Sequence, residues 1–126
     1  MTLPVNIEKQ IIELCGRYNL EVETTLNYIN SLIGNIEGYL IKDSGQGFYI
    51  YIHSRSIFYF FIITSYGLDC SMYPLKNIIE IGTKIENNLI KIKIFFSPEI
   101  AFEIDLQPEE FGNWTNMLKS MKKYIG

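Results

Sequence analysis

Two short runs near the end of the chain alternate apolar and polar residues so strictly that they fix how the two runs pair. In both 89–96 and 100–106 the even-numbered residues are apolar, which is typical of strands that bury one face. If the turn lies at 97–99, antiparallel pairing sets each of these apolar residues opposite another. The same register opposes Lys91 with Asp105 and Lys93 with Glu103. Because a slip of one residue would reverse the faces, the pattern predicts this hairpin in this register.

An amphipathic helix is predicted directly after the hairpin. Pro108 suits a first helical turn, and Glu109 and Glu110 place negative charge at the positive end of the helix dipole. Apolar residues then recur at steps of three and four, at Phe111, Trp114, Leu118, Met121 and Ile125. This spacing predicts one stripe that packs on the sheet, and an aromatic stripe of this kind is typical of a core.

The composition favours one folded domain over residues 1–126. The chain is 48% hydrophobic and 20% charged, which is typical of a globular protein, and it is long enough to bury a core without metal or disulfides. Its net charge is −3, and no basic stretch interleaved with aromatic residues occurs. Because binding to phosphate backbones needs clustered Lys and Arg, we expect no nucleic-acid partner.

The two cysteines, Cys15 and Cys70, lie far apart and lack the spacing of metal ligands. We therefore expect reduced thiols, no metal and no cofactor. The N-terminus shows no basic region followed by an apolar core, so no secretory signal is predicted. The most apolar run, 57–63, is far shorter than the roughly 20 residues that span a bilayer. These features predict a cytoplasmic protein without a transmembrane segment.

Residues 1–35 are predicted to be a helical segment before the first strand. A first helix over 4–16 places apolar residues on one face and ends at Gly16, and a second helix over 23–33 ends at Gly34. The apolar face of the first helix comprises Ile7, Ile11, Leu14 and Cys15. The intervening segment 18–23 alternates enough that a short strand is the alternative there.

The hydrophobic period changes to two after this segment. Strands at 36–42 and 48–53 are predicted to form a hairpin around a turn at 43–47. The strand predicted at 57–64 is apolar on both faces, so it is either central and covered twice, or one of its faces is an interface. The segment from Tyr66 to Asp69 is expected to end this strand and separate it from the next one. Further short strands are predicted at 70–73 and 77–82, with a turn at 86–88.

These elements predict an α+β fold in which a partly open antiparallel β-barrel or sandwich of about six or seven strands is capped by the C-terminal helix. Over 36–126 this order resembles the pleckstrin-homology superfold, as found in bacterial PH-like domains. The likeness depends on 37–40, on 73–78, and on 102–106 leading to Trp114. The resemblance implies a barrel sealed by the helix, and loops or an exposed sheet edge that bind phosphoinositides, peptides or proteins. It implies no catalysis.

The lipid-binding signature of that family places basic residues in the first hairpin, and Lys42, His53 and Arg55 fall at comparable positions. They are the candidates for an anionic ligand. However, a histidine replaces one cation, and the turn at 43–47 adds an acid and no lysine. Solvated strand ends are therefore the favoured interpretation, and lipid binding at a membrane surface is an alternative function.

Our main functional hypothesis is an adaptor that binds a protein or peptide and is not an enzyme. Tyr49 and Tyr51 are expected to be exposed and, with Tyr59 of the apolar strand, to form the partner surface. A small acidic chaperone or immunity-type inhibitor is the alternative, and a homodimer is compatible with either. His53 is the only histidine, so a Ser-His or Cys-His catalytic pair would have to be built around it.

Overall fold

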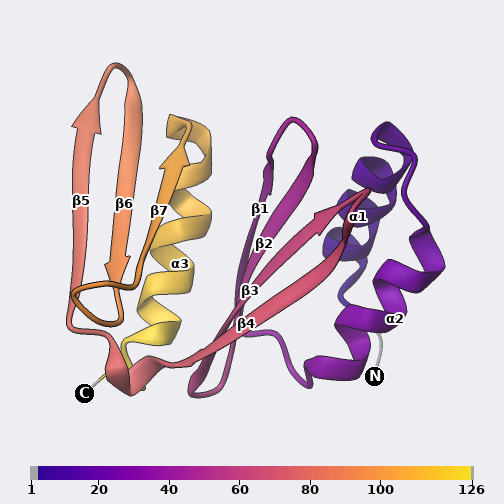
Figure 1. Cartoon of the computed structure of the whole chain (residues 1–126). Helices are drawn as coiled ribbons and strands as arrows, with labels where there is room; N and C mark the ends of the chain where they lie inside the picture. The colour runs from indigo at the N-terminus through magenta and orange to yellow at the C-terminus, as the bar shows by residue number, and fades with distance from the viewer. Residues whose placement is uncertain (1–2, 126) are drawn as a thin grey trace.

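Two antiparallel sheets pack face to face, and helices cover the outer face of the larger sheet and one side of the space between the sheets (Figure 1). The computed structural model describes residues 3–125. Its elements are α1 (Val5–Arg17), α2 (Val22–Leu32), β1 (Gly38–Asp43), β2 (Gly47–Ser54), β3 (Ile57–Thr64), β4 (Gly67–Pro74), β5 (Glu80–Glu86), β6 (Leu89–Phe95), β7 (Ala101–Leu106) and α3 (Phe111–Met121). Short 3₁₀ turns occupy Leu75–Asn77 and Pro108–Glu110. The predicted α+β class is confirmed.

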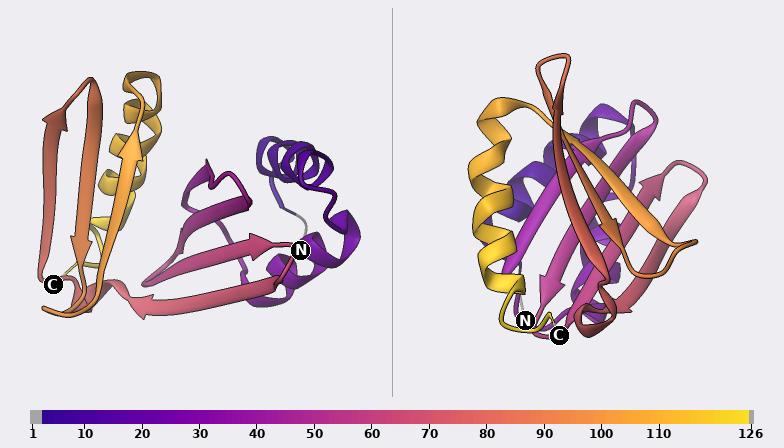
Figure 2. Two further views of the ribbon diagram at one scale, coloured as in Figure 1. Left: turned by 45° about the horizontal axis from the view of Figure 1, so that its top comes forward. Right: turned by 90° about the vertical axis from the view of Figure 1, so that its left-hand side faces the viewer.

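The four-stranded sheet has the order β1-β2-β3-β4, and the three-stranded sheet has the order β5-β6-β7. Helices α1 and α2 cover one face of the four-stranded sheet, whereas the smaller sheet and α3 lie on its other face (Figure 2). Within residues 3–125 no strand of one sheet pairs with a strand of the other, so the sheets do not close into a barrel. No helix in this range is long and apolar enough to cross a membrane.

Both predicted N-terminal helices are confirmed, with small differences at their ends. Helix α1 continues past Gly16 to Arg17, and the chain then turns through Asn19, which has a φ of 55°. The alternative of a strand at 18–23 is wrong, because these residues form the turn and the first residues of α2. The apolar face predicted for α1 is buried against the sheet.

The apolar strand β3 is central, as one of the two alternatives predicted. It pairs with β2 on one side and with β4 on the other. Phe58 faces the smaller sheet, and Phe61 and Ile63 face α1 and α2, so both faces are covered. The expected interruption at Tyr66 to Asp69 is too long, because Thr64 already pairs with Gly67 around a two-residue turn.

The register predicted for the final hairpin is confirmed throughout. Lys91 faces Asp105, Lys93 faces Glu103, and the Phe96 N–H donates to the Ile100 carbonyl at 2.9 Å. The strand predicted at 77–82 is misplaced, because a 3₁₀ turn comes first and β5 runs from Glu80 to Glu86. The turn that follows has φ values of 53° and 64° at Asn87 and Asn88, as a type I′ hairpin requires.

Helix α3 closes the space between the two sheets beside β1. Trp114, Met117 and Met121 are buried in the core that the two sheets share. Phe111, predicted for the same stripe, is 38% exposed. The difference arises because the helix proper begins at Phe111, after a 3₁₀ turn, so this ring lies at the helix end and outside the apolar core.

Candidate functional site

The three tyrosines predicted to bind a partner do not form one surface. Tyr51 is only 4% exposed, because its ring stacks on Phe60 with centroids 5.0 Å apart and the smaller sheet covers it. The expectation that Tyr51 is exposed was wrong. Tyr49 is half-buried on the same face as Tyr51, whereas Tyr59 is half-buried on the opposite face, against the ring of Phe61. A role for Tyr49 and Tyr59 in partner binding stays a prediction.

The three candidate residues for an anionic ligand also lie apart. Lys42 faces Tyr49 at one end of the first hairpin, and His53 faces Gly38 at the other end. The Lys42 Nζ atom forms an ion pair with Glu110 at 2.6 Å. Of the three, only Arg55 is exposed, in the turn between β2 and β3. His53 contacts Arg55 only through the Arg55 backbone carbonyl, so the three side chains do not form one cationic cluster.

His53 is completely buried and links β2 to α3. Its Nδ1 atom lies 3.2 Å from the Arg55 carbonyl, and its Nε2 atom lies 2.8 Å from the Ser120 hydroxyl. Because a carbonyl only accepts, we assign the proton to Nδ1, and Nε2 then accepts from the Ser120 hydroxyl. Burial lowers the pKa of His53, partly offset by the Arg55 carbonyl and the charge of Glu37. We interpret this Ser-His contact as a structural link.

The lowered pKa of His53 predicts that the protein loses stability as the pH falls through the range of histidine. Because its pKa is lowered in the folded protein, the buried imidazole takes up a proton at a lower pH than the histidine of the unfolded chain does. The unfolded chain therefore binds more protons, and the free energy of unfolding decreases. Denaturant titrations at several pH values measure this slope.

Replacement of His53 with Gln is the matched control for this slope. The variant should be less stable at every pH, because the hydrogen bonds of His53 to the Arg55 carbonyl and the Ser120 hydroxyl change. Its free energy of unfolding should, however, vary less between about pH 7 and about pH 5. Asp43 does not contribute to this slope. The pKa of Asp43 is lowered, mainly by the hydrogen bond from the Tyr18 hydroxyl, so Asp43 titrates below this pH window. Equal slopes for the wild type and His53→Gln contradict the prediction.

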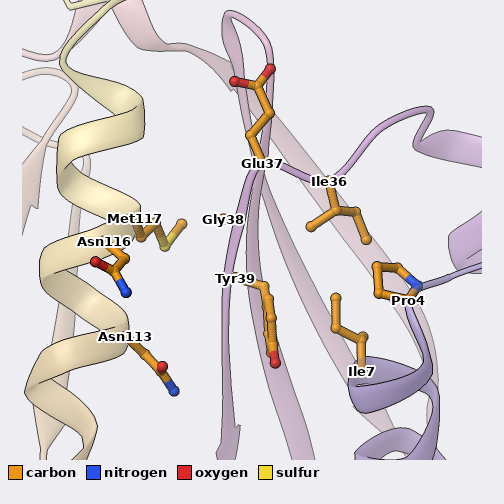
Figure 3. A pocket seen from close by; sticks show the side chains of 9 residues that line it. All are labelled: Pro4, Ile7, Ile36, Glu37, Gly38, Tyr39, Asn113, Asn116 and Met117. Carbon is orange, nitrogen blue, oxygen red and sulfur yellow. The ribbon is translucent and has the colours of Figure 1, made fainter.

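A small open cleft lies between α1, the start of β1 and α3 (Figure 3). Its volume is about 230 Å³, and the amides of Asn113 and Asn116 project from α3 toward Tyr39. Its one carboxylate, that of Glu37, accepts from the Arg55 N–H at 2.8 Å and from the Tyr124 hydroxyl at 3.4 Å. This carboxylate thus serves the fold, and the other polar side chains that line the cleft are two amides and a phenol.

Two strongly exposed aliphatic side chains of the smaller sheet lie in β5 and in the residue that directly precedes it. Ile79 is 63% exposed and Ile85 is 77% exposed. Between β5 and α3 lies a hollow of about 420 Å³, which we call the β5–α3 groove. Its lining residues are Ile78, Ile79, Glu80, Ile81, Thr83, Leu118, Lys122 and Ile125. The groove has an apolar floor and one charge of each sign.

The backbone of β5 adds unpaired hydrogen-bonding groups to this groove. Glu86 and Leu89 close a two-residue hairpin, so the even-numbered residues of β5 exchange hydrogen bonds with β6. The N–H and C=O groups of Ile81, Thr83 and Ile85 consequently point to the free edge of the sheet. Within residues 3–125 none of these groups has a backbone partner at that edge.

The groove was missed in the sequence, although one signal for it was present. Residues 80–86 alternate charged or small residues with Ile81, Thr83 and Ile85, which is the pattern of a half-buried strand. This pattern could have placed β5 correctly. It could not have shown that the apolar face of β5 remains uncovered, because this depends on where α3 docks.

No model of a known protein family matches the chain, and neither a curated protein nor a solved structure shows significant similarity to it. Cys15 and Cys70 are free thiols, the first buried and the second half-buried. Across residues 3–125 no three side chains of the types His, Cys, Asp and Glu come together in a way that could hold a metal ion.

Proposed function

We propose that this protein is a binding module that captures an extended segment of a partner protein on the free edge of β5. The observation that carries the proposal is the combination, on one strand, of unpaired backbone groups and an uncovered apolar face. Addition of a strand satisfies the backbone groups, and alternate side chains of the peptide fill the groove. Peptide binding at an exposed sheet edge also agrees with the resemblance to the pleckstrin-homology superfold.

The backbone and the side chains of β5 support the same mode of binding. Ile81, Thr83 and Ile85 direct their main-chain groups to the edge, and their side chains share the face of Ile92 and Ile94. A peptide strand at this edge would therefore continue that face and lie beside α3. Each isoleucine that it covers contributes about 1.5 kcal/mol or more through apolar burial.

The lining of the groove indicates the chemistry of the peptide. Leu118 and Ile125 of the C-terminal segment are half-buried and offer aliphatic contacts. Among residues 3–125, the charged side chains that line the groove are Glu80 and Lys122, and their charges cancel. We infer a peptide with uncharged, aliphatic or β-branched residues at alternate positions. Electrostatic steering contributes little to the binding of such a peptide by this protein, whose net charge is −3.

Selection from a random peptide library with the purified protein, followed by NMR, tests this proposal. Selected peptides should share alternating aliphatic residues. On binding, the amides of Ile81, Thr83 and Ile85 should become protected from hydrogen exchange, whereas the amides of Gly82 and Lys84 should change little, because they already bond to β6. Protection of both sets, or of neither, contradicts strand addition.

Replacement of Thr83 with Pro isolates the edge of β5. Thr83 is exposed and its N–H points outward, so proline removes a donor for the peptide and leaves the bonds to β6 in place. We expect selected peptides to bind at least about tenfold more weakly, with a change in unfolding free energy below about 1 kcal/mol. Met72→Pro, the matched change on the edge of β4, should leave peptide binding unchanged.

A further inference from the structure

The outer edge of β4 is a second strand edge without a backbone partner, on the other sheet. β4 pairs with β3 along its whole length, through eight consecutive residue pairs from Gly67 to Pro74, and it is the last strand of its sheet (Figure 1). Because Thr64 and Gly67 close a two-residue turn, Leu68, Cys70 and Met72 direct their backbone groups outward. Within residues 3–125 these groups have no backbone partner at that edge.

β4 differs from the other edge strands in its charge. Edge strands are commonly protected from edge-to-edge pairing with other copies of the same chain by charged residues, above all lysine, or by bulges. β5 carries three charged residues, β7 carries Glu103 and Asp105, and β1 has α3 beside it. In β4 the only charge is Asp69, and its register has no bulge. Such an edge is open to pairing with another strand.

We propose that β4 pairs with β4 of a second copy of this chain, antiparallel and centred on Cys70. The two four-stranded sheets then form one continuous sheet across a two-fold axis. In this register Leu68 faces the partner's Met72, and Asp69 faces the partner's Ser71. Every outward N–H and C=O of Leu68, Cys70 and Met72 then has a partner.

Charge and backbone chemistry select this register among its neighbours. Pairing centred on Asp69 would set two carboxylates directly opposite each other, which is destabilising. Pairing centred on Ser71 would bring Pro74, which has no N–H, into the ladder. Only the register centred on Cys70 leaves Pro74 outside and opposes each aspartate with a hydroxyl. The edge is therefore complementary to itself, which is why a second copy is the inferred occupant.

The oligomeric state in solution tests the interface. Light scattering after size exclusion, between about 1 and about 500 µM, should show a rise in mass from 14.7 kDa toward twice this value. Met72→Pro removes an outward donor and should shift the dissociation constant at least about tenfold toward monomer. Thr83→Pro should leave the rise unchanged, because it alters only the β5 edge. A wild type that stays monomeric, or a Met72→Pro variant that still dimerises, overturns the proposal.

Oxidation of the native cysteines tests the register. Residues directly opposite in a hydrogen-bonded antiparallel pair have Cα atoms about 5.5 Å apart, within the range of a disulfide. Copper phenanthroline should therefore link two copies through Cys70, and the Cys15→Ser variant should be linked equally, because Cys15 is buried. Cys70→Ser should abolish the link and retain the dimer. A dimer that Cys70 does not link overturns this register.

Discussion

Replacing Gly47 with alanine is expected to cost the protein about 3 kcal/mol or more of its unfolding free energy. Gly47 is the first residue of β2, and a Cβ atom there would lie 2.1 Å from the backbone oxygen of Ile63 on β3. Its φ is 155°, which residues with a side chain rarely adopt. Since the obstacle is backbone, β2 and β3 would have to separate where they begin to pair.

Gly45, two residues earlier in the same turn, provides the matched control. It also has a positive φ, of 85°, but a Cβ atom there would meet nothing within 4 Å. Gly45→Ala should therefore cost only the strain of a residue with a side chain in the left-handed region, about 1 kcal/mol. Chemical denaturation followed by circular dichroism compares the two variants. Similar losses for Gly45→Ala and Gly47→Ala would show that the close approach to Ile63 does not limit the fold.

The sequence predicted those parts of the fold that depend on neighbours in the chain. The register of β6 and β7 followed from alternation alone, because a one-residue slip would expose Ile92 and Ile104 and bury lysines. The two apolar faces of β3 left two alternatives, a central strand or an interface, and the structure shows the central strand. For the hairpin, the burial pattern alone carried enough information.

The candidate site could not be predicted because it depends on contacts between distant segments. Tyr51 alternates with Ile50 and Ile52 as an outward residue would, yet the smaller sheet, which begins at Glu80, covers it. Conversely, Ile85 has the pattern of a buried residue and is exposed, because α3 docks beside β1 and leaves the edge of β5 open. A period of two identifies the two faces of a strand but not which face is covered.

Replacement of Trp114 with alanine is the second change with a large expected effect. Trp114 is 1% exposed and lies at the centre of the core between the two sheets and α3. Truncation of a buried aromatic residue leaves a cavity and costs about 3–5 kcal/mol. The loss should be especially disruptive here, because α3 contains Gly112 and depends on docking for its stability.

Phe111, in the same helix, is the control that separates burial from aromatic character. Its ring is 38% exposed and does not belong to the core cluster, so Phe111→Ala should cost about 1 kcal/mol or less. Trp114→Phe, which retains part of the buried volume, should fall between the two alanine variants. Far-ultraviolet circular dichroism during denaturation follows all three without the tryptophan as a probe. Equal losses for Phe111→Ala and Trp114→Ala would mean that α3 does not close the core through Trp114, and the helix would then have to dock by another face.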